Sequence, residues 1–321
     1  MRTLTMRAAI NEALHTALNS DETVFTMGED IAVYGGQLRC TYDLLEHFGE
    51  NRVMDAPISE MAIVGAGVGA SLVGMRPIVE LSYIDFISTS FDQILNQAAK
   101  IRYMYGGMVS LPLVIRTQCG AGLGNGAQHS QSLEAILSHI PGIRVVMPSD
   151  AYEAKGLLLR AIRDNNPVVF IEHKALYKTK CEVPEEPYEC DYTCAVKRTG
   201  RDVTVVAYSA MVRQAMDAAA RLEKEGIDAE VIDVRALEPF DADTIVQSVK
   251  KTGRLVIVHE ACRKGGFGAE IAATVQERAF DSLKKPILRV AAPSVPVPFA
   301  PNLERCYVPN SEDIINAIHT W

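Results

Sequence analysis

The chain has 321 residues, of which 48% are hydrophobic, and a formal net charge of −8 at pH 7. This length suggests two domains with ample cores, and the acidic balance argues against nucleic acid or an anionic membrane surface as a partner. The longest uncharged apolar stretch, from Met61 to Met75, is too short to span a bilayer. Since the N-terminal segment reads as an amphipathic helix and not as a signal peptide, we expect a soluble, cytoplasmic protein.

The seven cysteines are scattered and form no C-x-x-C pair. Their odd number and their spacing predict free thiols in a reducing compartment. Cys190 and Cys194 lie close together, but no second Cys/His pair accompanies them, so the pattern does not favour a zinc site.

Short, continuously apolar runs alternate with amphipathic runs over the first 180 residues. This alternation is typical of a parallel sheet that helices cover on both faces. The predicted strands are 23–30, 76–82, 111–117, 144–149 and 167–173, and the predicted helices are 5–20, 59–74, 90–106, 130–140 and 150–164.

The alternation stops at a stretch rich in proline and acids, then resumes. We therefore predict an α/β protein with two doubly wound domains, residues 1–180 and 199–321, joined by a linker at 181–198. In the second domain the predicted strands are 202–209, 228–234, 254–260 and 286–292, and the predicted helices are 211–226, 241–253 and 268–280. The proline-rich stretch 292–302 predicts an extended segment.

The glycines of GAGVGAS, from Gly65, do not form a dinucleotide fingerprint, because their spacing is G-x-G-x-G and they lie inside a predicted helix. Ala62, Gly65, Ala66, Gly69 and Ala70 recur at helical spacing and predict a face of small residues. Each glycine inside a helix costs about 1 kcal/mol relative to alanine. We therefore expect this face to pack closely against another backbone at an interface.

Three side chains are candidates for chemistry. Glu60 begins the small-residue helix, where favourable contact with the helix dipole, worth roughly 0.3–1 kcal/mol, is the simple explanation. An acid desolvated in apolar surroundings keeps its proton to higher pH, so Glu60 also suits a ligand with a basic ring nitrogen. His129 closes a glycine-rich loop, 116–132, that is either a flexible connection or a site after a strand. Phe86 is either a core residue or a platform for a flat heterocycle.

The chain resembles a known family nearly from end to end. Three segments carry the resemblance in combination: APISEMAIVGAGVGASLVGMRPIVELSYIDF, GAQHSQSLEAILSHIPGIRVVMPSDAYEAKGLLLRAIRDNNPVVFIEHKALY and HEACRKGGFGAEIAA. They resemble the beta subunit of the thiamine-diphosphate-dependent first component of 2-oxo acid dehydrogenase complexes. The segments QHSQSLEA and FIEHKALY look most like the acetoin dehydrogenase branch of this family, with pyruvate dehydrogenase next. The resemblance implies a transketolase-like pyrimidine-binding domain followed by a transketolase C-terminal-like domain.

The resemblance also implies roles for the candidate residues. Glu60 would hydrogen-bond the aminopyrimidine ring of thiamine diphosphate and promote its imino tautomer, which takes the proton from the thiazolium carbon. Phe86 would pack on the pyrimidine, and Ile58 and Ser82 would line it. His129 would lie near the bound intermediate and the incoming lipoyl group.

Members of this family hold the diphosphate through magnesium and a G-D-G motif, and no GDG occurs in this chain. By resemblance that half of the site belongs to an alpha subunit, so we expect an α2β2 heterotetramer that docks to a dihydrolipoyl acyltransferase core and receives its lipoyl domain. Some members also bind potassium, through backbone carbonyls and a carboxylate. The matching positions are Leu113, Ala161, Ile162, Asp164 and Asn166.

The function that the resemblance implies is cleavage of acetoin and transfer of the two-carbon unit to lipoamide. The alternative within the family is a pyruvate or branched-chain 2-oxo acid dehydrogenase. Two readings from other classes stay open, an NAD-dependent oxidoreductase and a non-catalytic assembly subunit. The glycine spacing argues against the first, and Glu60 and His129 argue against the second.

Overall fold

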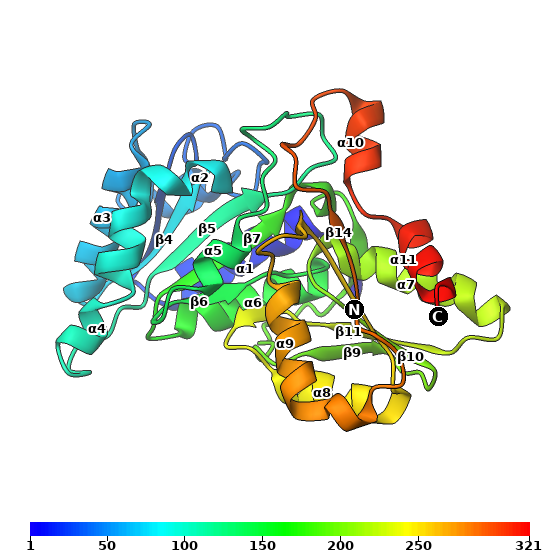
Figure 1. The fold of residues 1–321 in the computed structure, drawn as a ribbon. Helices are drawn as coiled ribbons and strands as arrows, with labels where there is room; N and C mark the ends of the chain where they lie inside the picture. Colours follow the sequence, from blue (N-terminus) through cyan, green and yellow to red (C-terminus); the bar gives the residue numbers. More distant parts are fainter. The chain divides into compact units, whose positions relative to one another are not determined.

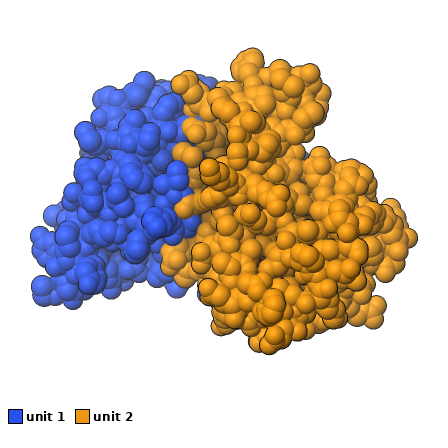
Figure 2. Space-filling view, in the orientation of Figure 1, with its two compact units in different colours: residues 1–119, 136–191 blue, residues 120–135, 192–321 orange.

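The computed structural model describes residues 1–321, which divide into two compact units (Figure 2). Unit 1 comprises residues 1–119 and 136–191, and unit 2 comprises 120–135 and 192–321. The predicted linker is not featureless, because β8 (Lys180–Val183) and β9 (Ala195–Arg198) fall largely within it. The domain boundaries at 180 and 199 stay a prediction.

The central sheet of unit 1 is parallel, as predicted from its apolar strands (Figure 1). Its strands, in spatial order, are β6 (Arg144–Val146), β7 (Val168–His173), β5 (Val114–Cys119), β4 (Arg76–Leu81), β2 (Val24–Gly28) and β3 (Val53–Asp55). Every residue of β5 and β7 is buried. Both strands begin with apolar side chains, as a strand covered on both faces requires, and both end in buried polar ones, among them Arg116 and Glu172.

The helices of the first half follow the predicted order but differ in length. They are α1 (Met6–Ser20), α2 (Leu44–Phe48), α3 (Glu60–Leu72), α4 (Ile101–Met104), α5 (Glu134–Ser138) and α6 (Ala151–Arg163). Three irregular helical segments accompany them: 3-10 turns at Ile84–Ser90 and Lys174–Leu176 and a π-helical segment at Gln93–Ala98. β1 (Arg2–Thr5) pairs antiparallel with β8.

The single helix predicted over 90–106 is wrong, because the structure breaks it between the π-helical segment and α4. At the break the chain at Gly142 packs directly on the carbonyl of Ala99, where an added Cβ would lie 2.0 Å from the oxygen. This approach of two backbones is a tertiary contact, and the local periodicity carries no trace of it.

Helix α3 has the predicted face of small residues. Gly67 points to the sheet, where an added Cβ would lie 2.8 Å from Leu113 and 2.9 Å from Val79. On the opposite side Ala62, Ala66 and Gly69 are exposed in the single chain. The close-packing surface expected from the sequence is therefore uncovered.

Unit 2 holds a second sheet, in which only the edge strand β9 runs antiparallel. The strands in spatial order are β14 (Leu288–Ala292), β13 (Leu255–Cys262), β10 (Val203–Ala207), β11 (Ala229–Asp233) and β9. The remaining elements are the short strand β12 (Ala236–Glu238), α7 (Ala210–Lys224), α8 (Ala242–Thr252), α9 (Gly268–Ala279), a 3-10 turn (Phe280–Ser282), α10 (Pro301–Tyr307) and α11 (Ser311–His319).

The strand β10 shows how helices cover both faces of this sheet. Val203 and Val205 join one apolar cluster with α7 and α11. Thr204 lies between them and its hydroxyl bonds those of Ser248 and Thr252 on α8, at 2.6 and 2.8 Å. Alternate residues of a strand point to opposite faces, so α8 lies on the face opposite α7. No helix in the structure is both long and apolar enough to cross a membrane.

His259 is a buried histidine in β13. Its Nδ1 lies 3.0 Å from the carbonyl oxygen of Ala261, which places the ring proton on Nδ1, and its Nε2 has no hydrogen-bond partner. The backbone at Gly266 and Gly268 closes over the ring, where added Cβ atoms would each lie 2.6 Å from ring atoms. Burial lowers the pKa of His259 to about 4.

We expect this histidine to make the folded chain acid-sensitive. The unfolded chain protonates His259 near pH 6.5, and the folded chain protonates it near pH 4. The contribution of this group to stability is therefore complete above about pH 7 and is lost as the pH falls from about 6.5 to about 4. Urea unfolding should lose about 2 kcal/mol between pH 7 and pH 5 through this one group, at about 1.4 kcal/mol per pKa unit. In His259→Asn, whose amide can still donate to Ala261, the loss should be smaller by that amount. An equal loss in both proteins would contradict the assignment.

Candidate functional site

Glu60 is the first residue of α3 and is half-buried. Its Oε2 accepts a hydrogen bond from the hydroxyl of Thr89 at 3.1 Å, and the same hydroxyl lies 2.8 Å from the carbonyl oxygen of Phe86. Thr89 thereby fixes the carboxylate next to the 3-10 turn that carries Phe86. Oε1 carries no hydrogen bond within the chain, so one oxygen of a positioned carboxylate is available to a ligand.

Glu29 is a second carboxylate that the sequence reasoning missed. It directly follows β2, at the carboxyl edge of the sheet, where α/β proteins place their sites. Burial raises the pKa of Glu29, and the negative charges of Asp30 and Glu60 raise it further. Glu29 therefore keeps its proton to higher pH than a free glutamate does, close to Glu60. The signal in the sequence was an acid immediately after a buried strand.

The other predicted cofactor residues lie on the segments that flank Glu60. Ser82 directly follows β4 and is buried, and Phe86 is half-buried with its ring edge-to-face against Tyr83 at 6.2 Å. Ile58 lies two residues before Glu60 and is 76% exposed. The structure thus joins Glu60 and Phe86 through Thr89. The link runs to the backbone carbonyl of Phe86, and an available carboxylate oxygen on a neighbouring segment fits a ligand with a basic nitrogen.

His129 belongs to unit 2, so the structure does not bring it together with Glu60 within one unit. Its loop is held at the glycine-rich end by two buried carboxylates. Glu260 accepts a hydrogen bond from the backbone N–H of Ala121 at 2.6 Å, and Glu304 of α10 accepts from Gly122 and Gly124 at 2.7 and 3.0 Å. Gly122 and Gly124 have φ angles of 102° and 68°, a conformation that favours glycine. The hydrogen bonds to Glu260 and Glu304 therefore hold this end of the loop in a defined conformation.

The five positions expected to hold potassium lie near the end of α6 and the start of β5: Leu113, Ala161, Ile162, Asp164 and Asn166. The guanidinium of Arg76 donates to the carbonyl oxygens of Ile162 and Asp164 at 3.0 and 3.2 Å. A carbonyl oxygen has two lone pairs. Each of these oxygens can therefore accept the hydrogen bond from Arg76 and also coordinate an alkali cation. Potassium at these positions stays a prediction.

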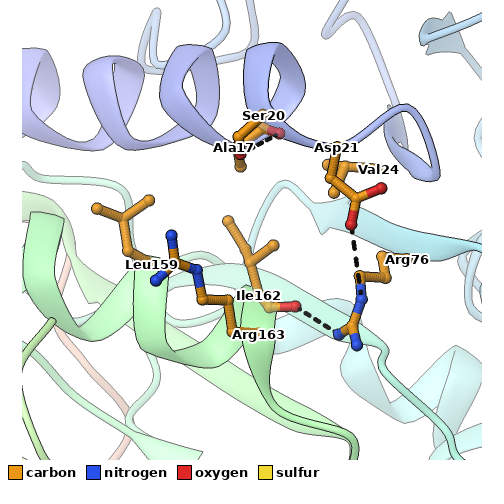
Figure 3. A pocket seen from close by; sticks show the side chains of 8 residues that line it. All are labelled: Ala17, Ser20, Asp21, Val24, Arg76, Leu159, Ile162 and Arg163. Carbon is orange, nitrogen blue, oxygen red and sulfur yellow. Dashed lines mark hydrogen bonds and ion pairs between the residues drawn. The ribbon is translucent and has the colours of Figure 1, made fainter. Parts of the chain in front are cut away.

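A cavity of about 330 Å³ lies beside these carbonyls, between α1 and α6 (Figure 3). Its lining residues are Ala17, Ser20, Asp21, Val24, Arg76, Leu159, Ile162 and Arg163. Arg76 is committed to Asp21 and to backbone oxygens, and Arg163 pairs with Glu189. Each arginine thus already has a carboxylate partner in the chain, and Arg163 shares Glu189 with Arg160.

Comparison with known proteins supports the resemblance seen in the sequence. Residues 2–180 match the family described as transketolase, pyrimidine binding domain, and residues 193–314 match transketolase, C-terminal domain. Among solved structures, a chain described as "Split gene transketolase, inactive beta4 tetramer" aligns over 99% of this chain and 98% of its own, with a TM-score of 0.83 and 25% identity.

Curated relatives narrow the family further. The subunit beta of acetoin:2,6-dichlorophenolindophenol oxidoreductase from Cupriavidus necator is 48% identical over 98% of this chain and 96% of that relative. The pyruvate dehydrogenase E1 component subunit beta from Bacillus subtilis is 45% identical over 98% of this chain and 97% of that relative. The chain therefore belongs to the family of transketolase-like beta subunits that includes those of acetoin dehydrogenases and of the first component of pyruvate dehydrogenase.

Proposed function

We propose that this chain is the beta subunit of a thiamine-diphosphate-dependent acetoin dehydrogenase, which cleaves acetoin and passes the two-carbon unit to lipoamide. The observation that carries the proposal is the Glu60 carboxylate, with one oxygen held by Thr89 and the other available beside Phe86. The identity of 48% to an acetoin oxidoreductase subunit supports the acetoin branch. A 2-oxo acid such as pyruvate or a branched-chain acid is the second candidate, because a pyruvate dehydrogenase subunit is 45% identical.

When bound, thiamine diphosphate supplies a carbon nucleophile and an electron sink. The chain's own residues then orient it and handle protons. Glu60 would hydrogen-bond the basic ring nitrogen of the aminopyrimidine through the carboxylate oxygen that Thr89 does not hold. Phe86 and Ser82 would line the ring. Burial, with the charges of Asp30 and Glu60, raises the pKa of Glu29, so this carboxyl keeps its proton to higher pH than a free glutamate does.

The second half of the site must come from another chain. The sequence contains no GDG motif for the diphosphate and its magnesium, and the small-residue face of α3 is uncovered next to Glu60. Further apolar side chains are exposed in α4 and just after it, at Tyr103, Tyr105 and Met108. Exposed apolar surface next to an incomplete site fits an obligate interface. We propose that an alpha subunit covers it in an α2β2 heterotetramer, which delivers its product to the lipoyl domain of an acyltransferase core.

His129 is proposed to act in the transfer to the lipoyl group. We expect His129→Gln to lower the rate of acetyl transfer to a lipoyl domain by about 100-fold or more, the scale of a lost acid–base group. Reduction of an artificial dye acceptor, which needs no such proton transfer, should fall far less. His139→Gln changes an exposed histidine and should leave both rates as they are. Equal losses in the two assays of His129→Gln would contradict this role.

Potassium remains a subsidiary proposal. If the ion shares the Ile162 and Asp164 carbonyls with Arg76, it should raise the melting temperature of the chain in potassium buffer relative to tetramethylammonium buffer of equal ionic strength. Equal melting temperatures in the two buffers would contradict the proposal.

The substrate is tested by comparing turnover directly. The chain is expressed with its genomic neighbours and assayed with acetoin, pyruvate and a branched-chain 2-oxo acid, in the presence of thiamine diphosphate, magnesium and a dye acceptor. Faster turnover of acetoin is the expected result. A preference for pyruvate would keep the chemistry at Glu60 and overturn the choice of branch.

A further inference from the structure

Three side chains outside the proposed cofactor site converge between α1 and the start of α2. His15 lies on α1, Asp43 directly precedes α2, and His47 lies one turn into α2. The Nε2 of His15 is 2.9 Å from Oδ1 of Asp43. One ligand atom from each of the three residues lies within 4.8 Å of the other two. Two imidazoles and a carboxylate therefore share one small volume, brought together from positions 28 and 4 residues apart.

The backbone and ring contacts already orient the donors. Asp43 has a φ of 63° and does not use its carboxylate to cap α2, so that carboxylate faces His15 and not the helix end. The Nδ1 of His47 lies 2.9 Å from the carbonyl oxygen of Asp43, which places the ring proton on Nδ1 and leaves the Nε2 lone pair available. A carbonyl that fixes the tautomer in this way is the usual outer contact of a metal-binding histidine.

The distances are close to those of a tetrahedral metal site. Metal–ligand bonds of roughly 2.0–2.1 Å place neighbouring ligand atoms about 3.3 Å apart. His15 and Asp43 need to separate by only a few tenths of an ångström from 2.9 Å, and a cation then takes the place of the proton that they share. The ligand atom of His47 lies within 4.8 Å of those of His15 and Asp43, so it needs to move inward by at most about 1.5 Å.

We propose that His15, Asp43 and His47 bind a divalent cation of the zinc class, with water as the fourth ligand. Two neutral imidazoles and one carboxylate suit zinc and its neighbours among the transition metals and not magnesium or calcium, which take oxygen ligands. The side chains of His15 and Asp43 are 22% and 30% exposed and His47 is exposed, so the open position reaches solvent.

The site would clip a specific loop to α1. Residues 30–43 run from the end of β2, just after Glu29, to the start of α2. Asn11 on α1 already holds this loop through the carbonyl oxygens of Cys40 and Tyr42, at 3.0 and 3.1 Å. A cation at His15 and Asp43 adds a second attachment one turn further along α1.

The test is zinc binding by the full chain, purified without a histidine tag and stripped with a chelator. We expect one equivalent of zinc to bind with micromolar or better affinity in calorimetry, and cobalt to bind with a visible spectrum that lacks a thiolate charge-transfer band. His15→Ala and His47→Ala should each weaken binding by about 100-fold, the scale of a lost ligand or outer contact, while far-UV circular dichroism stays unchanged. His139→Ala, which removes an exposed histidine outside the cluster, should bind as the unchanged chain does.

Two results would overturn the site. One is zinc binding that persists at full strength in both histidine variants, with a thiolate band in the cobalt spectrum, since the metal would then be held by the chain's cysteines. The other is a folded chain that binds no zinc at micromolar concentration.

Discussion

Glu60→Gln will lower kcat for acetoin cleavage in the complete complex by about three orders of magnitude, within the range for a lost acid–base group. The amide has the size of the carboxylate, and its oxygen can still accept the hydrogen bond from Thr89. It cannot receive a proton, so a ring nitrogen opposite it loses its proton-transfer partner. The melting temperature of the chain should change little. Steady-state kinetics of the reconstituted complex, with a melting curve of the chain, measures both effects.

The matched control for this variant is Glu50→Gln, which removes the same charge from an exposed position. It should turn over as the unchanged complex does. If Glu60→Gln stays within twofold of the unchanged enzyme, the carboxylate has no part in the chemistry. The chain would then be an assembly subunit, and the catalytic reading of this site would be wrong.

The second large effect concerns a buried ion network in the sheet of unit 1. Arg116 on β5 is completely buried and donates from Nη1 to Glu80 at 2.6 Å and from Nε and Nη2 to Glu172 at 2.7 and 2.9 Å. The two glutamates come from β4 and β7, the strands on either side of β5. The hydroxyl of Tyr177 also donates to Glu172. Burial raises the pKa of Glu172, although Arg116 opposes the shift.

We expect Arg116→Met to destabilise the chain by about 3–5 kcal/mol, because it leaves two carboxylates buried without a counter-charge. The triple variant with Glu80→Gln and Glu172→Gln should recover part of this loss, since neutral amides are less costly to bury. Urea unfolding of the purified chain measures both changes.

Arg163→Met is the control for a surface ion pair. Arg163 pairs with Glu189, and its side chain is 61% exposed, so its loss should cost at most about 1 kcal/mol. A cost for Arg116→Met no larger than that of Arg163→Met would show that the buried network contributes no more than a surface pair.

The fold was predictable where one local pattern decided it. The apolar runs at β5 and β7 and the helical spacing of α3 each determined an element without help from distant residues. Elements that depend on tertiary pairing were missed, such as β1 and β8, which pair over nearly 180 residues. α10 and α11 were missed although local signals existed, namely a proline at the first position of α10 and a capping box of Asn310 with Asp313 at α11.

The residues of the site also fall into those that the local sequence marks and those that only tertiary contacts reveal. Glu60 stood out as a lone acid in apolar sequence, and family resemblance gave it a partner, but the Thr89 hydroxyl that fixes it is visible only in the structure. Glu29 had a signal, an acid after a buried strand, that was not used. Arg116 could not have been matched to its glutamates, which lie 36 and 56 residues away. His15, Asp43 and His47 have no spacing that marks a metal motif, because their proximity depends on how α1 meets α2.

The central claim is that this chain carries one half of a thiamine diphosphate site, and binding of the cofactor tests it most directly. Thiamine diphosphate with magnesium is titrated into the chain alone, into its alpha partner alone and into the purified complex of the two. Tight binding in the complex, with weak or no binding to either chain alone, and weakened by Glu60→Gln, is the predicted result. Tight binding or turnover by the isolated chain, or a complex that binds no cofactor, would contradict the account.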